Sequence, residues 1–140
     1  MTAAACETDD LARRFCERTL PKAEWTHCAH IRVGLWHLLT YGEEAALELL
    51  RERIKAYNVA VGGENTDTGG YHETITRFYV WLIARFLENE DRALPIDELA
   101  HLLLARYGAK EVPLRYFSKE RLMSVEARRA WIEPDLRPLA

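Results

Sequence analysis

The sequence predicts an all-α fold: a single-domain bundle of about five main helices, followed by short helices and an extended C-terminal tail. Apolar residues recur at intervals of three and four along most of the chain, which is the spacing of amphipathic helices. Glycine and proline stand between these periodic segments, where helices usually end. The 140 residues fit one domain, and a hydrophobic fraction of 49% is enough to form its core.

The boundaries of the helices follow from residues that favour helix ends. We expect main helices over residues 7–18, 26–41, 43–60, 71–87 and 95–107. Thr26 is the expected N-cap of the second, Gly42 its stop, and Pro95 begins the last. Ser118 and Ser124 are predicted to cap two short helices, and the prolines beyond them predict the extended tail.

The helix over 26–41 is predicted to lie at the centre of the domain, because apolar side chains cover all but one stripe of its surface. Short connections between helices favour up-and-down packing. In that arrangement this helix and the helix over 71–87 run in the same direction. Their N-termini would then lie at the same end of the bundle.

Residues 62–70 are predicted to form a mobile loop, since four of them are glycine and most of the others are small and polar. The loop contains neither of the glycine patterns that bind phosphate or dinucleotides. Because it leads directly into the helix over 71–87, our hypothesis is that it gates a site at the start of that helix.

Composition argues against several classes of protein. A net charge of −3 and a pI near 6.0 argue against nucleic-acid binding. No apolar stretch approaches the ~20 residues that cross a membrane, and the first ten residues lack the features of a signal peptide. Cys6, Cys16 and Cys28 form no C-x-x-C pair, so we expect reduced thiols in a cytoplasmic protein. The oligomeric state leaves no signature in the sequence.

A polar stripe follows the otherwise apolar helix over 26–41. At 100° per residue, five positions fall within it: His27, His30, Gly34, His37 and Tyr41. Such a stripe either faces solvent or lines an internal polar site. In the second case, the missing side chain of Gly34 leaves room for a ligand.

A second polar group begins the helix over 71–87. His72 shares a helical face with Thr76 and Ile83. Because Ile83 and its neighbours face the core, His72 is expected to point inward. Glu73 lies on the shoulder of this face and is expected to pair with Arg77, four residues later.

Three segments of the chain resemble the signatures of a family of small bacterial all-helical proteins to which no activity is assigned. They are Trp25-Thr26-His27-Cys28-Ala29-His30-Ile31-Arg32-Val33, then Tyr71-His72-Glu73-Thr74-Ile75-Thr76, and Tyr116-Phe117-Ser118 with the Arg121-Leu122, Ala127-Arg128 and Pro134-Asp135 pairs that follow. The resemblance spans most of the chain. It implies a helical fold and a set of candidate residues, and no reaction. His37 is not part of the family pattern.

The leading hypothesis is a transition-metal site formed by His27, His30, His72 and Glu73, where the two helix N-termini meet. Two ligands at i,i+3 on one helix can chelate a metal, as Glu-x-x-His does in di-iron bundles. Three imidazoles and a carboxylate suit Zn, Fe, Ni or Cu. Because the bundle is large enough to fold without metal, we expect an open site for small-molecule chemistry. Whether the protein is an enzyme stays open; in one, Glu73 would be the general base.

Two alternatives remain. In the first, the same histidines, together with Arg32, Arg77 and Thr76, bind a small anionic ligand without a metal. Arg32 lies between apolar neighbours on its helix, so we expect it to have a buried carboxylate partner, from the protein or from a ligand. In the second, one of the four tryptophans is exposed and anchors a protein partner.

Overall fold

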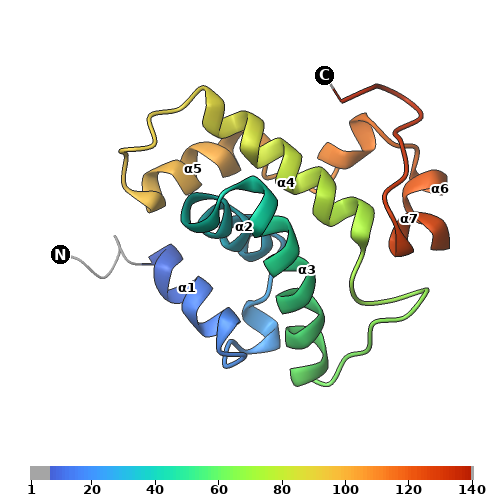
Figure 1. Cartoon of the computed structure of the whole chain (residues 1–140), viewed down its shortest axis with the longest axis horizontal. Helices are drawn as coiled ribbons and strands as arrows, with labels where there is room; N and C mark the ends of the chain where they lie inside the picture. The colour runs from blue at the N-terminus through green and yellow to red at the C-terminus, as the bar shows by residue number, and fades with distance from the viewer. Residues whose placement is uncertain (1–6, 140) are drawn as a thin grey trace.

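The computed structural model describes residues 7–139, and this part of the chain contains helices and connecting segments but no strand. The main helices are α1 (Glu7–Cys16), α2 (His27–Tyr41), α3 (Glu43–Ala60), α4 (Glu73–Glu88) and α5 (Ile96–Tyr107) (Figure 1). Shorter elements are η2 (Lys22–Glu24), η3 (Val112–Arg115), α6 (Lys119–Leu122) and α7 (Val125–Arg129). The all-α prediction is confirmed, and each main helix lies within two residues of its expected bounds.

Two other expectations from composition concern membrane-crossing helices and the cysteines. Within residues 7–139, no helix combines the length and the apolar character needed to cross a membrane. Cys16 and Cys28 are free thiols. Cys6 and the first six of the ten residues in which no signal peptide is expected lie outside the described residues.

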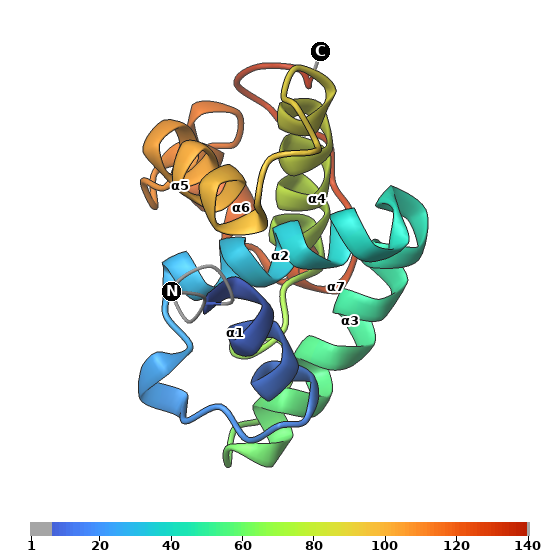
Figure 2. The ribbon, with the colours of Figure 1, turned by 90° about the vertical axis from the view of Figure 1, so that its left-hand side faces the viewer.

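Helix α2 lies at the centre of the fold, as its apolar circumference predicted. It contacts α1, α3, α4 and α5, and Figure 2 shows it passing among them. Ile31, Val33, Leu35 and Leu38 are buried at different angles around its axis. His37, on the polar stripe, is fully buried as well, so this part of the stripe is not a solvent face.

The expected up-and-down packing is wrong for α2 and α4. Figure 1 looks along α2 while α4 lies across the picture, so the two helices cross instead of running side by side. The two helices approach each other closely at Gly34 of α2 and Ile83 of α4. A Cβ atom added at Gly34 would lie only 3.1 Å from Cδ1 of Ile83. Gly34 therefore permits tight packing of the two helices. The connection over residues 61–72 is long, so it does not force α4 to run parallel to α2.

The C-terminal segment packs against the start of α4. Ser118 and Ser124 cap α6 and α7 through their side chains, as predicted. The hydroxyl of Thr74 donates to the carbonyl of Ala130 at 2.8 Å and accepts from the amide of Ile132 at 3.3 Å. Thr74 is fully buried, so these two hydrogen bonds fix the position of α7 relative to α4.

The side chain of Asn65 joins the glycine-rich loop over 62–70 to α3 and to Tyr71. The Oδ1 atom of Asn65 accepts from the amide of Tyr71 and from the side chain of Asn58, both at 3.0 Å. Its amide group donates to the carbonyl of Lys55 at 3.1 Å. The mobility of the loop stays a prediction. These polar contacts restrict the loop, and they could not be predicted from its glycines and its lack of apolar side chains.

Arg32 pairs with Glu7 at 2.6 Å, and the partner differs from the buried carboxylate that we expected. The side chain of Arg32 is 14% exposed, whereas that of Glu7 is 60% exposed and well solvated. We therefore predict that Arg32→Ala lowers the free energy of unfolding by about 1 kcal/mol, as for other solvated pairs, instead of the ~3–5 kcal/mol of a buried one. Denaturant titration measures the loss in the free energy of unfolding. Arg32→Met keeps the packing of the aliphatic part of the side chain and removes only the ion pair with Glu7. A loss above ~3 kcal/mol would contradict the prediction.

Candidate functional site

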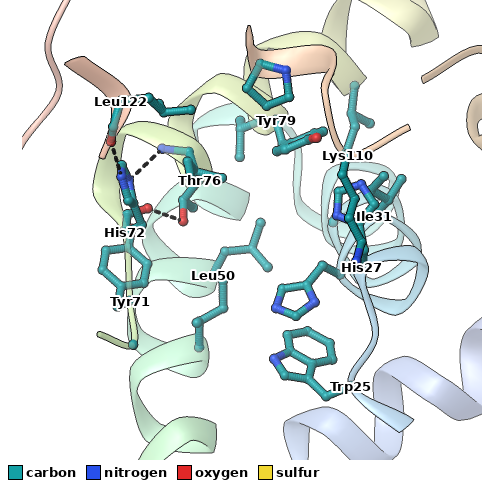
Figure 3. Close-up of a pocket in the computed structure, with 18 of the residues that line it drawn as sticks. Trp25, His27, Ile31, Leu50, Tyr71, His72, Thr76, Tyr79, Lys110 and Leu122 are labelled. Atoms are coloured by element: carbon teal, nitrogen blue, oxygen red, sulfur yellow. Dashed lines mark hydrogen bonds between the residues drawn. The ribbon is translucent and has the colours of Figure 1, made fainter. Parts of the chain in front are cut away.

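A cavity of about 610 Å³ opens between α2, α3, α4 and the segment that follows α5. Its walls are mainly apolar and include Ile31, Leu50, Ile54, Ile75, Val80 and Ile83. Cavities of about 300–1,000 Å³ with apolar walls and a few polar groups are typical binding sites for small molecules. The polar groups of this cavity therefore define the candidate functional site (Figure 3).

All three histidines of the metal hypothesis line this cavity, although α2 and α4 cross. His27 and His72 lie on opposite sides of it in Figure 3. Within the described residues, no three His, Cys, Asp or Glu side chains are grouped so that they could hold a metal ion. The structure thus brings His27, His30 and His72 to one cavity but does not assemble them with Glu73 into one ligand set.

His72 uses both of its ring nitrogens within the protein. Its Nδ1 atom accepts from the amide of Ile75 at 3.1 Å and so caps the N-terminus of α4. Nε2 therefore carries the proton, which it donates to the carbonyl of Leu122 at 2.7 Å. Burial lowers the pKa of His72, which keeps the ring neutral at pH 7. No lone pair remains for a metal unless one of these bonds breaks.

Glu73 points away from the cavity and pairs with Arg51 of α3, so the expected pair with Arg77 is wrong. Two hydrogen bonds join the guanidinium of Arg51 to the carboxylate, at 2.9 and 2.5 Å, and the hydroxyl of Tyr71 donates to it at 2.7 Å. Burial would raise the pKa of Glu73, but these hydrogen bonds outweigh it and hold the pKa below its ordinary value. Glu73 is therefore an ionised structural carboxylate, and the geometry gives it no contact with the cavity.

His30 and Trp25 form a stacked pair on the cavity wall. Their ring centroids are 3.8 Å apart, and Trp25 stacks on Phe15 on its other face. The Nδ1–H group of His30 donates to the carbonyl of Thr26 at 2.7 Å, so Nε2 holds the free lone pair. The surrounding protein lowers the pKa of His30, although its ring stays open to the cavity. His30 is a neutral acceptor next to a flat aromatic surface.

Two buried polar atoms have no hydrogen-bond partner among the described residues that surround the cavity: Nε2 of His27 and the hydroxyl of Tyr79. The two rings meet edge to face, with centroids 5.9 Å apart. Burial lowers the pKa of His27, with a further contribution from the charge of Lys110, and burial raises the pKa of Tyr79 to about 12. Both groups are neutral at pH 7, and leaving them unpaired costs about 1–3 kcal/mol each.

Two lysines line the cavity, and the carboxylate of Glu111 lies close enough for its charge to act on His27 and Tyr79. The lysines are Lys110 and Lys119, which are exposed, as are the apolar side chains of Leu114 and Met123 that also line the cavity. An amphipathic ligand would meet cations at the entrance and apolar walls further in. Sequence reasoning missed both lysines, because they lie in the region after α5 where proline and glycine interrupt helical periodicity.

The other candidate residues divide between the cavity and elsewhere. Thr76 lines the cavity, but its hydroxyl donates to the carbonyl of His72 at 2.8 Å. Arg77 lies outside it, with its guanidinium 5.2 Å from the ring centre of Trp131. His37 donates from Nδ1 to the carbonyl of Val33 and accepts at Nε2 from Arg53, so it is a structural histidine. All four tryptophans are half-buried, and the alternative of a protein partner stays a prediction.

Comparison of the chain with protein-family models, with curated proteins and with solved structures finds no match. The resemblance to a bacterial family therefore stays a prediction. Its first two segments supply His27, His30 and His72 to the cavity, and its third supplies Leu122, whose carbonyl accepts the hydrogen bond from His72.

Proposed function

We propose that the protein binds a small molecule with an apolar body and one anionic group, such as a carboxylate, in the cavity between α2, α3 and α4. The observation that carries this proposal is the pair of unpartnered polar atoms, on His27 and Tyr79, in a cavity with otherwise apolar walls. Unpaired polar groups at a site strengthen the binding of a ligand that completes their hydrogen bonds.

The donor groups define the ligand chemistry. The hydroxyl of Tyr79 and the Nε2 atom of neutral His27, as its N–H tautomer, both donate hydrogen bonds, and Lys110 adds a positive charge nearby. Two donors and a cation match a carboxylate, which accepts several hydrogen bonds. The apolar walls then cover an aliphatic or aromatic body, and Trp25 with His30 offers a flat surface for stacking.

Calorimetry with decanoate tests the proposal. We predict that wild type binds decanoate and that Tyr79→Phe weakens binding about tenfold or more, because it removes a hydrogen bond to a charged group. Ile54→Trp should abolish binding by filling the cavity. Leu47→Trp is the matched control, since Leu47 lies on the same helix, is also half-buried and does not line the cavity. Absence of binding by wild type, or equal loss in both tryptophan variants, would contradict the proposal.

A transition-metal site at His27 and His30 is the second candidate. Both residues line the cavity, and Nε2 of each has no hydrogen-bond partner among the described residues. Two imidazoles on one helix would then leave the remaining metal positions to a bound ligand or water. Zinc titrations of wild type and of His30→Ala separate the candidates: tight zinc binding that is lost in the variant would favour the metal, whereas zinc-independent decanoate binding favours the metal-free pocket.

A further inference from the structure

A second concave site lies on the other side of the Tyr71–Glu73 segment, with a volume of about 480 Å³. It is formed by α3, the start of α4, the loop over 62–70 and α7. Five cationic side chains line it: Arg51, Lys55, Arg77, Arg128 and Arg129. Only two carboxylates accompany them. The site therefore has a formal charge of +3, whereas the whole chain has a net charge of −3. We call it the basic pocket.

The two carboxylates neutralise two of the five cations. Glu73 pairs with Arg51, and Asp67 pairs with Arg129 at 2.7 Å. Among the described residues, Lys55, Arg77 and Arg128 have no carboxylate within ion-pair distance, and each of the three comes from a different helix. The charge of Arg77 also acts on Glu73, but the site as a whole keeps an excess of three positive charges, which is electrostatically unfavourable unless an anion joins them.

Contacts within the protein hold these three cations while leaving most of their N–H groups free. Arg77 lies over the ring of Trp131, 5.2 Å from its centre, and Lys55 lies over the ring of Tyr71 at 5.0 Å. A contact through an aromatic face uses no hydrogen-bond donor. The Nη1 atom of Arg128 donates to the carbonyl of Gly70 at 2.9 Å, which leaves the Nη2 and Nε donors of its guanidinium available. These contacts restrain the three side chains and leave hydrogen-bond donors for an anion.

We propose that the basic pocket binds a small molecule that carries a phosphate or diphosphate group. Guanidinium groups recognise phosphate oxygens through paired hydrogen bonds, and a second phosphate would engage a third cation. A nucleic-acid polymer fits less well, because its backbone needs an extended basic surface and the chain is acidic overall. The proposal does not depend on the cavity ligand, since the two sites share only Tyr71.

Calorimetry with inorganic pyrophosphate at low ionic strength tests this proposal. We predict that wild type binds pyrophosphate, that Arg77→Gln and Arg128→Gln each weaken binding about tenfold, and that added salt weakens it further. Asp67→Asn should tighten binding, because it removes a carboxylate and releases Arg129. Arg115→Gln is the matched control: it removes an exposed arginine that lines neither site.

Two further measurements separate this site from its alternatives. Ile54→Trp, which fills the cavity, should leave pyrophosphate affinity unchanged, so the two proposals can fail separately. No pyrophosphate binding by wild type, or equal losses in Arg77→Gln and Arg115→Gln, would overturn the proposal. Tighter binding of a single-stranded oligonucleotide than of pyrophosphate would overturn the assignment to a small molecule. If Arg128→Gln fails to fold, Arg77→Gln and Asp67→Asn still decide the question.

Discussion

Glu73→Gln is expected to lower the free energy of unfolding by about 2–3 kcal/mol, even though the side chain keeps its size. The carboxylate is 10% exposed and accepts from Arg51 and from Tyr71. The neutral amide still accepts one hydrogen bond but leaves Arg51 without its charged partner. Removing one member of a buried pair costs ~3–5 kcal/mol, and we expect less here because Arg51 is 35% exposed and water screens it.

A double-mutant cycle checks this prediction. Arg51→Gln alone should also be destabilising, whereas the double variant should lose less than the sum, because no unpaired charge then remains. Glu43→Gln removes a solvated carboxylate that pairs with Arg85, and it should change stability by less than ~0.5 kcal/mol. Additive losses, or a Glu73→Gln loss as small as that of the control, would show that the pair contributes little.

The helices were predictable because their signals are local. Periodicity, the N-cap residues Thr26, Ser118 and Ser124, and the stop at Gly42 all depend on residues within one or two turns. The crossing of α2 and α4 was not predictable in this way. It depends on how close two helices approach: Gly34, interpreted from the sequence as room for a ligand, lines the cavity and also lies against Ile83.

The candidate site was predictable only in part. The helical face correctly placed His72 toward the interior, whereas His27 is half-buried and His30 exposed; all three line one cavity. Their hydrogen-bond partners could not be foreseen, because the acceptor for His72 is the carbonyl of Leu122, 50 residues later. Sequence reasoning missed Arg51 for the same reason: its partner, Glu73, is 22 residues away and on another helix. Long-range partners of polar side chains leave no periodic signal in a single sequence.

The protein is expected to lose stability steeply between pH 6.5 and pH 4, mainly through His37. Burial lowers the pKa of His37 to about 4, and the nearby charge of Arg53 acts in the same direction. An unfolded histidine has a pKa near 6.5. Between these values the unfolded chain binds more protons than the folded one, so stability falls as pH falls. At ~1.4 kcal/mol per pKa unit, His37 alone accounts for roughly 3 kcal/mol.

The geometry explains why protonation of His37 is costly. Its Nδ1–H group donates to the carbonyl of Val33 at 2.8 Å, and a second proton on Nε2 would point at the guanidinium of Arg53, 2.9 Å away. Burial also lowers the pKa values of His27 and His72, which steepens the loss over the same range.

Urea denaturation at a series of pH values, on wild type and on His37→Gln, measures this effect. Glutamine offers a donor and an acceptor but cannot take up a proton, so the variant should be less stable at pH 7 and lose less on acidification. His101→Gln removes an exposed histidine on α5 and serves as the control. If wild type and His37→Gln lose the same stability between pH 7 and pH 4, protonation of His37 does not drive acid unfolding, and the other histidines whose pKa burial lowers, His27 and His72, would have to account for the loss.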